Sequence, residues 1–185
     1  MLPTSAKRRV AYTPPWREEE DPKPVYTLRT PTVEDRAEFN MALAERKAFY
    51  VTRSQFCGEA RKAVEALDPG NKADLLALLD RVAEIPEGAA IEGDDADQMG
   101  GLEDALIESW PAYARLVNAN RRWGAFMPVI AARMFLVGWK HGPDGTDRIG
   151  TLTDDDRMAI PPADMMAIGW KAVSLMTVSV EQKNA

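Results

Sequence analysis

The stretch KADLLALLDRVAE, residues 72–84, decides the fold class of this chain. Four of its apolar side chains recur at the spacing of one helix face, namely Leu75, Leu78, Leu79 and Val82. Charged side chains occupy the other side, so the pattern predicts an amphipathic helix packed against a core. A turn signal at residues 68–71 precedes this helix, and Pro86 and Gly88 end it.

Comparable patterns on both sides of this segment predict a mainly α fold, a compact multi-helix bundle. Thr32 is a favourable N-cap for the first helix, with Asp35 three residues further on. The expected helices cover residues 32–50, 54–67, 102–109, 111–123, 128–139 and 163–178. Trp110 precedes Pro111, which disfavours helical geometry at the tryptophan, so two helices are expected to meet there.

The segments between and beyond these helices have other compositions. Residues 1–24 carry five prolines and alternating charge, which predicts a flexible N-terminal arm. Residues 25–30 alternate and favour a short strand or extended segment. Together these patterns predict a single helical domain over residues 25–180, with a mobile acidic loop at 86–101 and a frayed tail at 181–185.

The net charge of −6 and the sequence pI near 4.9 oppose nucleic-acid binding, which requires clustered Lys and Arg. The short basic cluster at residues 7–9 is followed by the acidic run at 18–21, so the sign of the charge reverses. The most apolar stretch, residues 128–139, contains Arg133 and is shorter than the roughly twenty apolar residues of a membrane-spanning helix. Neither a nucleic-acid partner nor a membrane partner is expected, and no secretory signal is apparent.

Residues for nucleophilic or zinc chemistry are few. Cys57 is the single cysteine and has no histidine near it in the sequence, so we interpret it as a small, half-buried apolar side chain. His141, the single histidine, lies in a Gly/Pro-rich loop without a nucleophile motif. One cysteine and one histidine leave two zinc ligand positions to carboxylates, which is uncommon.

An acidic region after residue 143 raises the question of calcium. The spacing does not fit the usual calcium loop: with Gly150 as the turn glycine, two ligand positions fall on Gly145 and Ile149, which lack side-chain oxygens. A solvated loop followed by an acidic helix start explains the same residues. The aspartates concerned are Asp144, Asp147, Asp154, Asp155 and Asp156. The glycines form no phosphate-binding motif, so no catalytic, metal-binding or cofactor-binding residue is assigned and no enzyme is expected.

The chain is rich in tryptophan and methionine, types that favour both cores and adaptable protein interfaces. Packing in the core is the favoured interpretation of most of them. For partner binding we single out Trp123, Arg133 and Trp139, where an arginine interrupts an otherwise apolar run. Such a surface suits the helix-in-groove mode of recognition.

Two blocks of sequence resemble tail assembly chaperones of long-tailed bacteriophages. The first is PVYTLRTPT, residues 24–32, followed by Arg36. The second combines Trp123, the run AARMFLVGW at residues 131–139, Leu152-Thr153, Ile160-Pro161, Ile168-Gly169 and Leu175-Met176. The charged residues 1–24 and the acidic residues 86–101 depart from this pattern.

The resemblance implies a non-enzymatic factor in the bacterial host cytoplasm that binds the tape measure protein and promotes polymerisation of tail-tube protein around it. Two alternatives stay open: a structural virion protein of the tail completion or connector type, and a helical enzyme that uses carboxylates. Oligomeric state, including a homo-oligomer, is also left open by the sequence.

Overall fold

The computed structural model describes residues 8–181, and most of them are helical. The mainly α fold predicted from the sequence is confirmed, and a small antiparallel sheet accompanies the helices. The chain divides into two compact units where the sequence predicts one domain. Residues 49–123 form the helical unit, and residues 1–48 with 124–185 form the sheet unit. The predicted frayed tail, apart from Glu181, lies outside the described residues.

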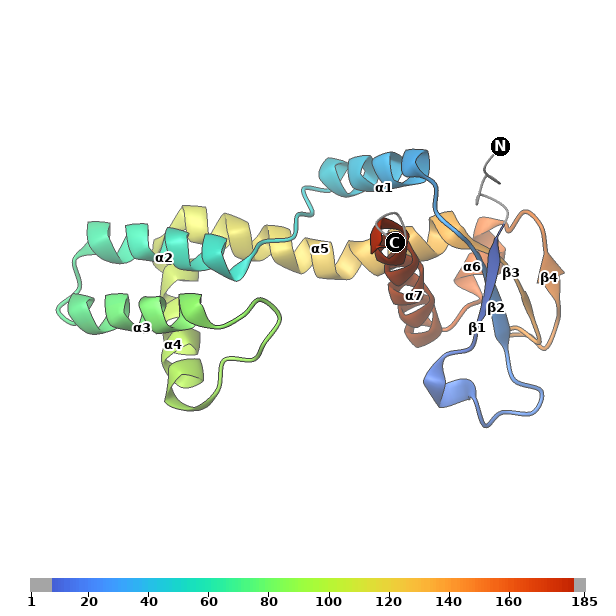
Figure 1. Ribbon diagram of the computed structural model, residues 1–185, viewed down its shortest axis with the longest axis horizontal. Coiled ribbons are helices and arrows are strands. Elements are labelled where there is room, and N and C mark those ends of the chain that lie inside the picture. Colours follow the sequence, from blue (N-terminus) through green and yellow to red (C-terminus); the bar gives the residue numbers. More distant parts are fainter. Residues whose placement is uncertain (1–7, 182–185) are drawn as a thin grey trace. The chain divides into compact units, whose positions relative to one another are not determined.

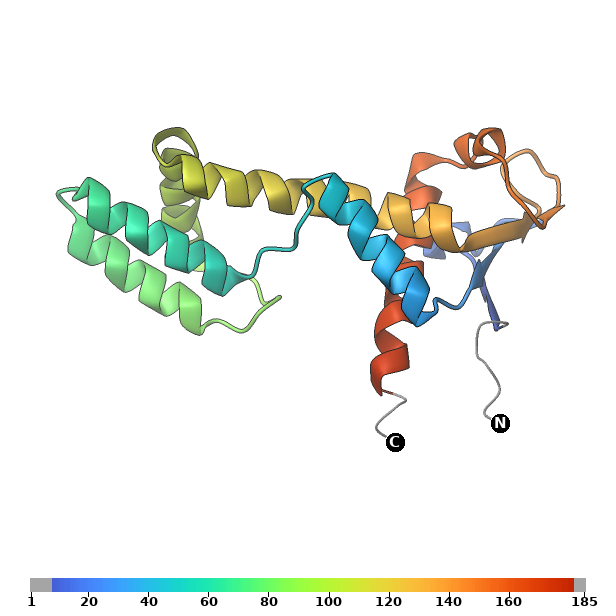
Figure 2. The same cartoon turned by 90° about the horizontal axis from the view of Figure 1, so that it is seen from above.

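The helical unit contains α2 (Arg53–Leu67), α3 (Lys72–Glu84), α4 (Gly93–Ser109) and the first part of α5 (Pro111–Phe135). Figure 1 and Figure 2 both show α2 and α3 side by side, joined by a tight turn. The turn predicted at residues 68–71 is confirmed, because α2 ends with its C-cap at Asp68. The predicted helix boundary at Trp110 is also confirmed, because Trp110 is the C-cap of α4.

The core of the helical unit forms from the apolar stripes that face one another. Leu78 and Leu79 of α3 and Ala60 and Ala63 of α2 are fully buried. Cys57 lies in the same cluster, and burial raises the pKa of its thiol. Its interpretation as a small apolar packing residue is therefore supported, although it is more buried than expected.

The prediction of a mobile acidic loop at residues 86–101 is wrong for residues 93–101, which are helical, whereas residues 86–92 form neither helix nor strand. Helix α4 begins at Gly93, and acidic side chains in its first turn are favoured by the helix dipole. The segment before α4 is also tied to α2, because Arg53 Nη1 donates to the carbonyl of Ile85 at 2.8 Å and Glu87 accepts from the Tyr50 hydroxyl at 2.6 Å. The acidic residues of this segment therefore belong to the start of a helix and to a turn that is held by hydrogen bonds.

The sheet unit contains four antiparallel strands in the order β1 (Arg9–Tyr12), β2 (Val25–Arg29), β3 (Leu136–Lys140) and β4 (Arg148–Ile149). The expected strand at residues 25–30 is thus present as β2. Its buried side chains alternate, so that Tyr26 pairs with Trp139 and Leu28 with Leu136 across the β2–β3 register. All four of these side chains are buried on one face.

The prediction of a flexible arm at residues 1–24 is wrong for its described part. Strand β1 pairs with β2 from Arg9↔Arg29 to Tyr12↔Tyr26, and a 3-10 turn, η2 (Pro15–Arg17), follows it. The turn is held through Trp16, whose indole N–H donates to Asp164 at 3.0 Å. Pairing with distant residues overrides the local signals of proline and charge.

The helix expected at residues 128–139 is also wrong in its bounds. Helix α5 runs without interruption from Pro111 to Phe135 and has Pro128 in its interior, although an interior proline removes one backbone hydrogen bond. Gly169 packs directly on the backbone of Pro128, which fixes this part of α5 in the core. The chain then becomes β3, because a short apolar run fits a buried strand as well as a helix.

Helices α1 (Val33–Glu45), α6 (Asp154–Met158) and α7 (Pro162–Glu181) complete the sheet unit. The predicted capping by Thr32 is confirmed, since Thr32 and Asp35 form a reciprocal capping box at α1. Helix α7 buries a stripe at intervals of four residues, consisting of Asp164, Ile168, Ala172 and Met176. The charged member of this stripe is the residue to which the N-terminal turn is anchored.

Candidate partner-binding groove

The three residues singled out for partner binding do not form one exposed surface. Trp139 is only 2% exposed and lies in the core of the sheet unit, where Gly142 packs against its indole ring. Arg133 is exposed on α5 in the same unit. Trp123 belongs to the helical unit, and its ring centroid lies 4.9 Å from that of Tyr50. Burial therefore removes Trp139 from the candidate surface, while roles for Trp123 and Arg133 stay predictions.

The carboxylates of the acidic region after residue 143 accept hydrogen bonds from groups of the same region. Asp147 accepts from the backbone N–H of His141 at 2.8 Å, and Asp144 accepts from the Thr146 hydroxyl at 2.7 Å. Asp156 completes a capping box with Thr153 at the start of α6. Across residues 8–181, no group of three or more His, Cys, Asp or Glu side chains is arranged to hold a metal ion.

Asp164 is the buried charged residue of the sheet unit, at 1% exposure. It accepts from the Tyr26 hydroxyl at 2.9 Å, from the Trp16 indole at 3.0 Å and from Arg17, whose Nη2 lies 3.2 Å away. Burial, together with the hydrogen bond to the Asp164 carboxylate, raises the pKa of Tyr26. This carboxylate is surrounded by donors from the N-terminal segment, so its evident role is to fasten that segment to α7.

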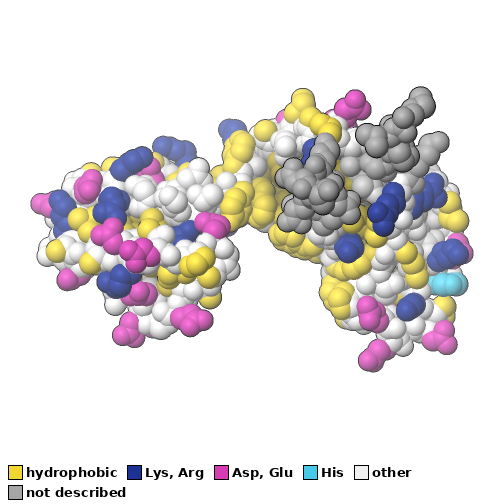
Figure 3. All heavy atoms as spheres, in the orientation of Figure 1, with side chains coloured by type: hydrophobic (Ala, Val, Ile, Leu, Met, Phe, Trp, Pro, Cys, Tyr) yellow, Lys and Arg dark blue, Asp and Glu magenta, His cyan; other side chains and the backbone are white. Residues whose placement is uncertain are grey.

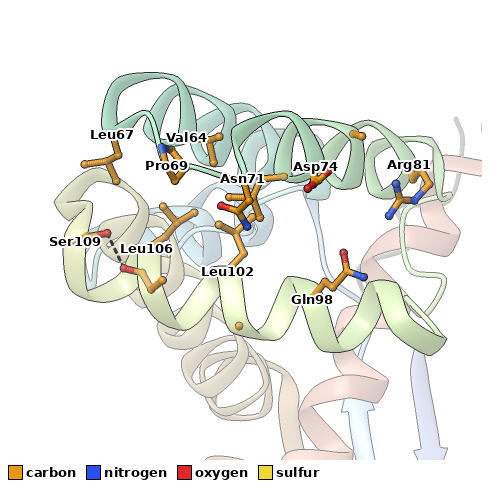
Figure 4. A pocket seen from close by; sticks show the side chains of 14 residues that line it. Val64, Leu67, Pro69, Asn71, Asp74, Arg81, Gln98, Leu102, Leu106 and Ser109 are labelled. Atoms are coloured by element: carbon orange, nitrogen blue, oxygen red, sulfur yellow. Dashed lines mark hydrogen bonds between the residues drawn. The ribbon is translucent and has the colours of Figure 1, made fainter.

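The helical unit contains a groove with a cavity volume of about 830 Å³ between α4 on one side and α3 with the end of α2 on the other (Figure 4). One end is apolar, formed by Val64 and Leu67 of α2 together with Leu106 of α4. The other end is polar and contains Arg81 of α3 and Gln98 of α4. Leu67 is half-exposed at the apolar end, so part of the lining surface is available to a partner.

Small side chains form much of the exposed lining. Ala77 of α3 and Gly101, Ala105 and Ser109 of α4 are all exposed and line the groove. A Cβ atom added at Gly101 would meet no atom within 4 Å, so the groove is open at that point. Small residues of this kind let a second backbone approach closely, while buried Leu102 and Leu106 provide an apolar floor.

The charges around the groove are mainly acidic. Arg81, the one cation in its lining, donates to Asp95 at 2.6 Å, and this contact lowers the pKa of Asp95. Asp74 also lines the groove and has no basic partner among the described residues. Figure 3 shows acidic and basic side chains interspersed with apolar ones on the visible face of the helical unit. The lining therefore carries one acidic side chain, Asp74, and one basic side chain that is already paired, while helices α3 and α4 as a whole are mainly acidic.

Comparison with known proteins gives no relatives: no family model matches the chain, and no curated protein or solved structure matches it significantly. Within residues 8–181, no helix has the length and apolar character needed to cross a membrane. The resemblance to tail assembly chaperones stays a prediction.

Sequence reasoning missed the groove, although a signal for it exists. The apolar stripe of α3 was recognised, but the small exposed residues on its flank and on α4 were not connected, because they are 24 or more positions apart. The signal is the set of small residues on these two helices, which indicates a place where the helix surfaces leave room for a further helix. They are Ala77, Gly101 and Ala105.

Proposed function

We propose that this chain is a non-enzymatic assembly chaperone of a long-tailed bacteriophage. It binds the tape measure protein in the cytoplasm of the bacterial host and promotes assembly of the tail-tube protein around it. The observation that carries this proposal is the open groove of the helical unit, with an apolar floor and small exposed walls. A surface of this shape suits a partner that presents an apolar helix face.

The resemblance noted in the sequence supports the same proposal from another part of the chain. Nearly all of its residues belong to the sheet unit, where Leu28, Leu136, Ile160 and Ile168 are buried. These residues build a scaffold and would not themselves contact a partner. The scaffold and the groove therefore contribute to the proposal independently.

Charge also fits a chaperone that must keep an apolar client dissolved. Residues 49–123 carry 14 acidic and 8 basic side chains, so the whole net charge of −6 lies in the unit that contains the groove. A surplus of one sign keeps complexes apart in solution. An apolar client helix bound in this unit would be surrounded by an acidic surface that repels other copies of the complex.

Co-expression with the tape measure protein encoded by the same phage tests the proposal. We expect the soluble fraction of the tape measure protein to rise and the two proteins to co-purify. A tape measure protein of unchanged solubility that does not co-purify would contradict the proposal. The chain should also be absent from purified particles by mass spectrometry, whereas stoichiometric presence there would favour the structural virion alternative.

A further inference from the structure

We propose that the groove between α3 and α4 binds one amphipathic helix that carries Lys and Arg on the flanks of its apolar face. This inference deepens the proposed function and rests on it only in taking the client to be a protein. It goes beyond that function by assigning the binding site and the chemistry of the segment that fills it.

The dimensions of the groove fit a helix. Its lining on α4 extends from Gln98 to Ser109, about 16 Å at the rise of 1.5 Å per residue, or roughly three helical turns. The exposed lining positions on α4 are Gln98, Gly101, Ala105 and Ser109, which repeat at three- and four-residue intervals and therefore follow one stripe. The opposite wall follows the stripe of Asp74, Ala77 and Arg81 on α3. Two such stripes with small residues between them match the packing surface of a third helix.

The floor sets the apolar character of the occupant. Leu102 and Leu106 are nearly buried, Leu75 is partly buried, and the half-exposed Leu67 extends the apolar surface at one end. A docked helix would bury this surface with apolar side chains spaced three and four residues apart. The exposed apolar area lies at the α2 end, so the largest apolar side chain of the occupant is expected there.

Charge identifies the flanks of the occupant. Helices α3 and α4 together carry nine acidic and two basic side chains, and α4 has no basic residue. Both basic residues are already in ion pairs, Lys72 with Asp68 and Arg81 with Asp95. Asp74 of the lining has no basic partner among the described residues, and most of the other acidic side chains of α3 and α4 lack one as well. An acidic helix would therefore be repelled, whereas Lys and Arg at its flanks would be attracted. The same distribution opposes nucleic acid as the occupant.

Designed peptides test this inference without any phage protein. The probes are a helical peptide of about 14 residues, roughly four turns, with Leu on one face and Lys on the other, its Leu/Glu counterpart, and a Leu/Lys peptide of scrambled order. Titration of the full chain by fluorescence anisotropy should show binding of the amphipathic Leu/Lys peptide at least about tenfold tighter than of either other peptide, a difference of 1.4 kcal/mol. Equal affinity for all three peptides, or no binding of the Leu/Lys peptide, would overturn the inference.

Matched substitutions locate the binding. Ala77→Trp fills the groove, whereas Ala83→Trp places the same side chain on an exposed position of α3 that is outside the lining and on another side of the helix. We expect Ala77→Trp to weaken peptide binding at least about tenfold and Ala83→Trp to leave it unchanged. Circular dichroism of both variants checks that α3 is intact, and Ala105→Trp on α4 provides a second block from the opposite wall. Undiminished binding in folded Ala77→Trp and Ala105→Trp variants would place the peptide elsewhere and overturn the inference.

Two further outcomes separate this inference from the proposed function and from self-association. Solubilisation of the tape measure protein by Ala77→Trp at the wild-type level would overturn the groove as the client site while leaving the chaperone function intact. A concentration-dependent dimer of the chain alone that Ala77→Trp abolishes would assign the groove to a second copy instead. Light scattering of the wild-type chain and the variant measures that outcome.

Discussion

The two units of this chain differ in how their contacts relate to the sequence. The helical unit is one uninterrupted stretch, residues 49–123, in which α2, α3 and α4 pack on their sequence neighbours and the start of α5 packs back on α2. The sheet unit combines two stretches, and its central strand pair joins Leu28 to Leu136. The helical unit has all of the net charge, while the rest of the chain carries 15 acidic and 15 basic residues. One unit is thus a single stretch with an exposed apolar groove and a surplus of acidic charge, and the other combines strands that are distant in the sequence and has no net charge.

The difference corresponds to a division between a structural scaffold in the sheet unit and a candidate binding groove in the helical unit. Residues that carry the resemblance to tail assembly chaperones mostly lie in the sheet unit, and many of them are buried there. The groove lies in the helical unit, outside those two blocks. Substitutions of buried residues in the sheet unit should therefore act through stability, and substitutions in the groove lining should act on binding.

The largest effect is expected in the core of the helical unit. Leu78→Ala removes a fully buried side chain and should lower the free energy of unfolding by about 4 kcal/mol, because it leaves a cavity. The matched change Leu67→Ala affects a half-exposed groove residue and should lower it by less than about 1 kcal/mol. Urea unfolding followed by circular dichroism measures both. Equal losses would show that the groove lining is itself a stabilising core.

A substitution in the sheet unit is expected to act through crowding. Gly169→Ala drives a Cβ atom into the backbone of Pro128 and should lower the free energy of unfolding by about 3 kcal/mol. Gly124→Ala, also in a helix, meets no atom within 4 Å and should be neutral or stabilising. Thermal unfolding compares the two variants. A Gly169→Ala variant as stable as the wild type would contradict the close packing of α7 on α5.

The next largest loss of stability is expected at Asp164, which anchors the N-terminal segment. Asp164→Ala leaves the buried Tyr26 hydroxyl without its acceptor and should lower the free energy of unfolding by about 2 kcal/mol. Asp164→Asn keeps an acceptor oxygen and should lose less. Asp154→Ala removes an exposed carboxylate and serves as the control. Limited proteolysis near Trp16 should become faster in Asp164→Ala, and an unchanged rate would argue against the anchor.

A smaller, pH-dependent effect is expected at the start of α1. The Arg29 guanidinium, which donates to Asp35 at 2.7 Å, lowers the pKa of that carboxyl from 3.8 to about 2. A lowered folded-state pKa gives stability that is present above pH 3.8 and is lost as the pH falls toward 2. Asp35→Asn should therefore flatten the loss of stability over this interval. Parallel acid unfolding curves for the wild type and Asp35→Asn would contradict this role.

Local chemistry predicted much of the helical unit from sequence and less of the sheet unit. The stripe from Leu75 to Val82 and the turn before Lys72 were sufficient to predict α3, because a helix is determined by contacts within a few residues. Strand β1 and strand β3 were missed, because each is stabilised by pairing with β2. The same apolar run that ends α5 continues into β3, and no local period distinguishes the two.

The candidate site was predictable only in its general character. Sequence indicated protein binding by a helical body but selected Trp139, which the sheet buries. Large aromatic residues attract attention in a sequence, yet burial is decided by the pairing of strands that are distant in the chain. The groove is formed instead by small residues, such as Ala77 and Ala105, and by the arrangement of helices α2, α3 and α4.

Site-specific photo-cross-linking tests the central claim, that the groove of the helical unit holds the client, most directly. Benzoylphenylalanine replaces Leu67, which lines the groove, or its exposed neighbour Ala66, which does not, and each variant is co-expressed with the tape measure protein. We predict a cross-linked product from position 67 and none from position 66. Co-purification with no product from position 67, or equal products from 66 and 67, would contradict the account.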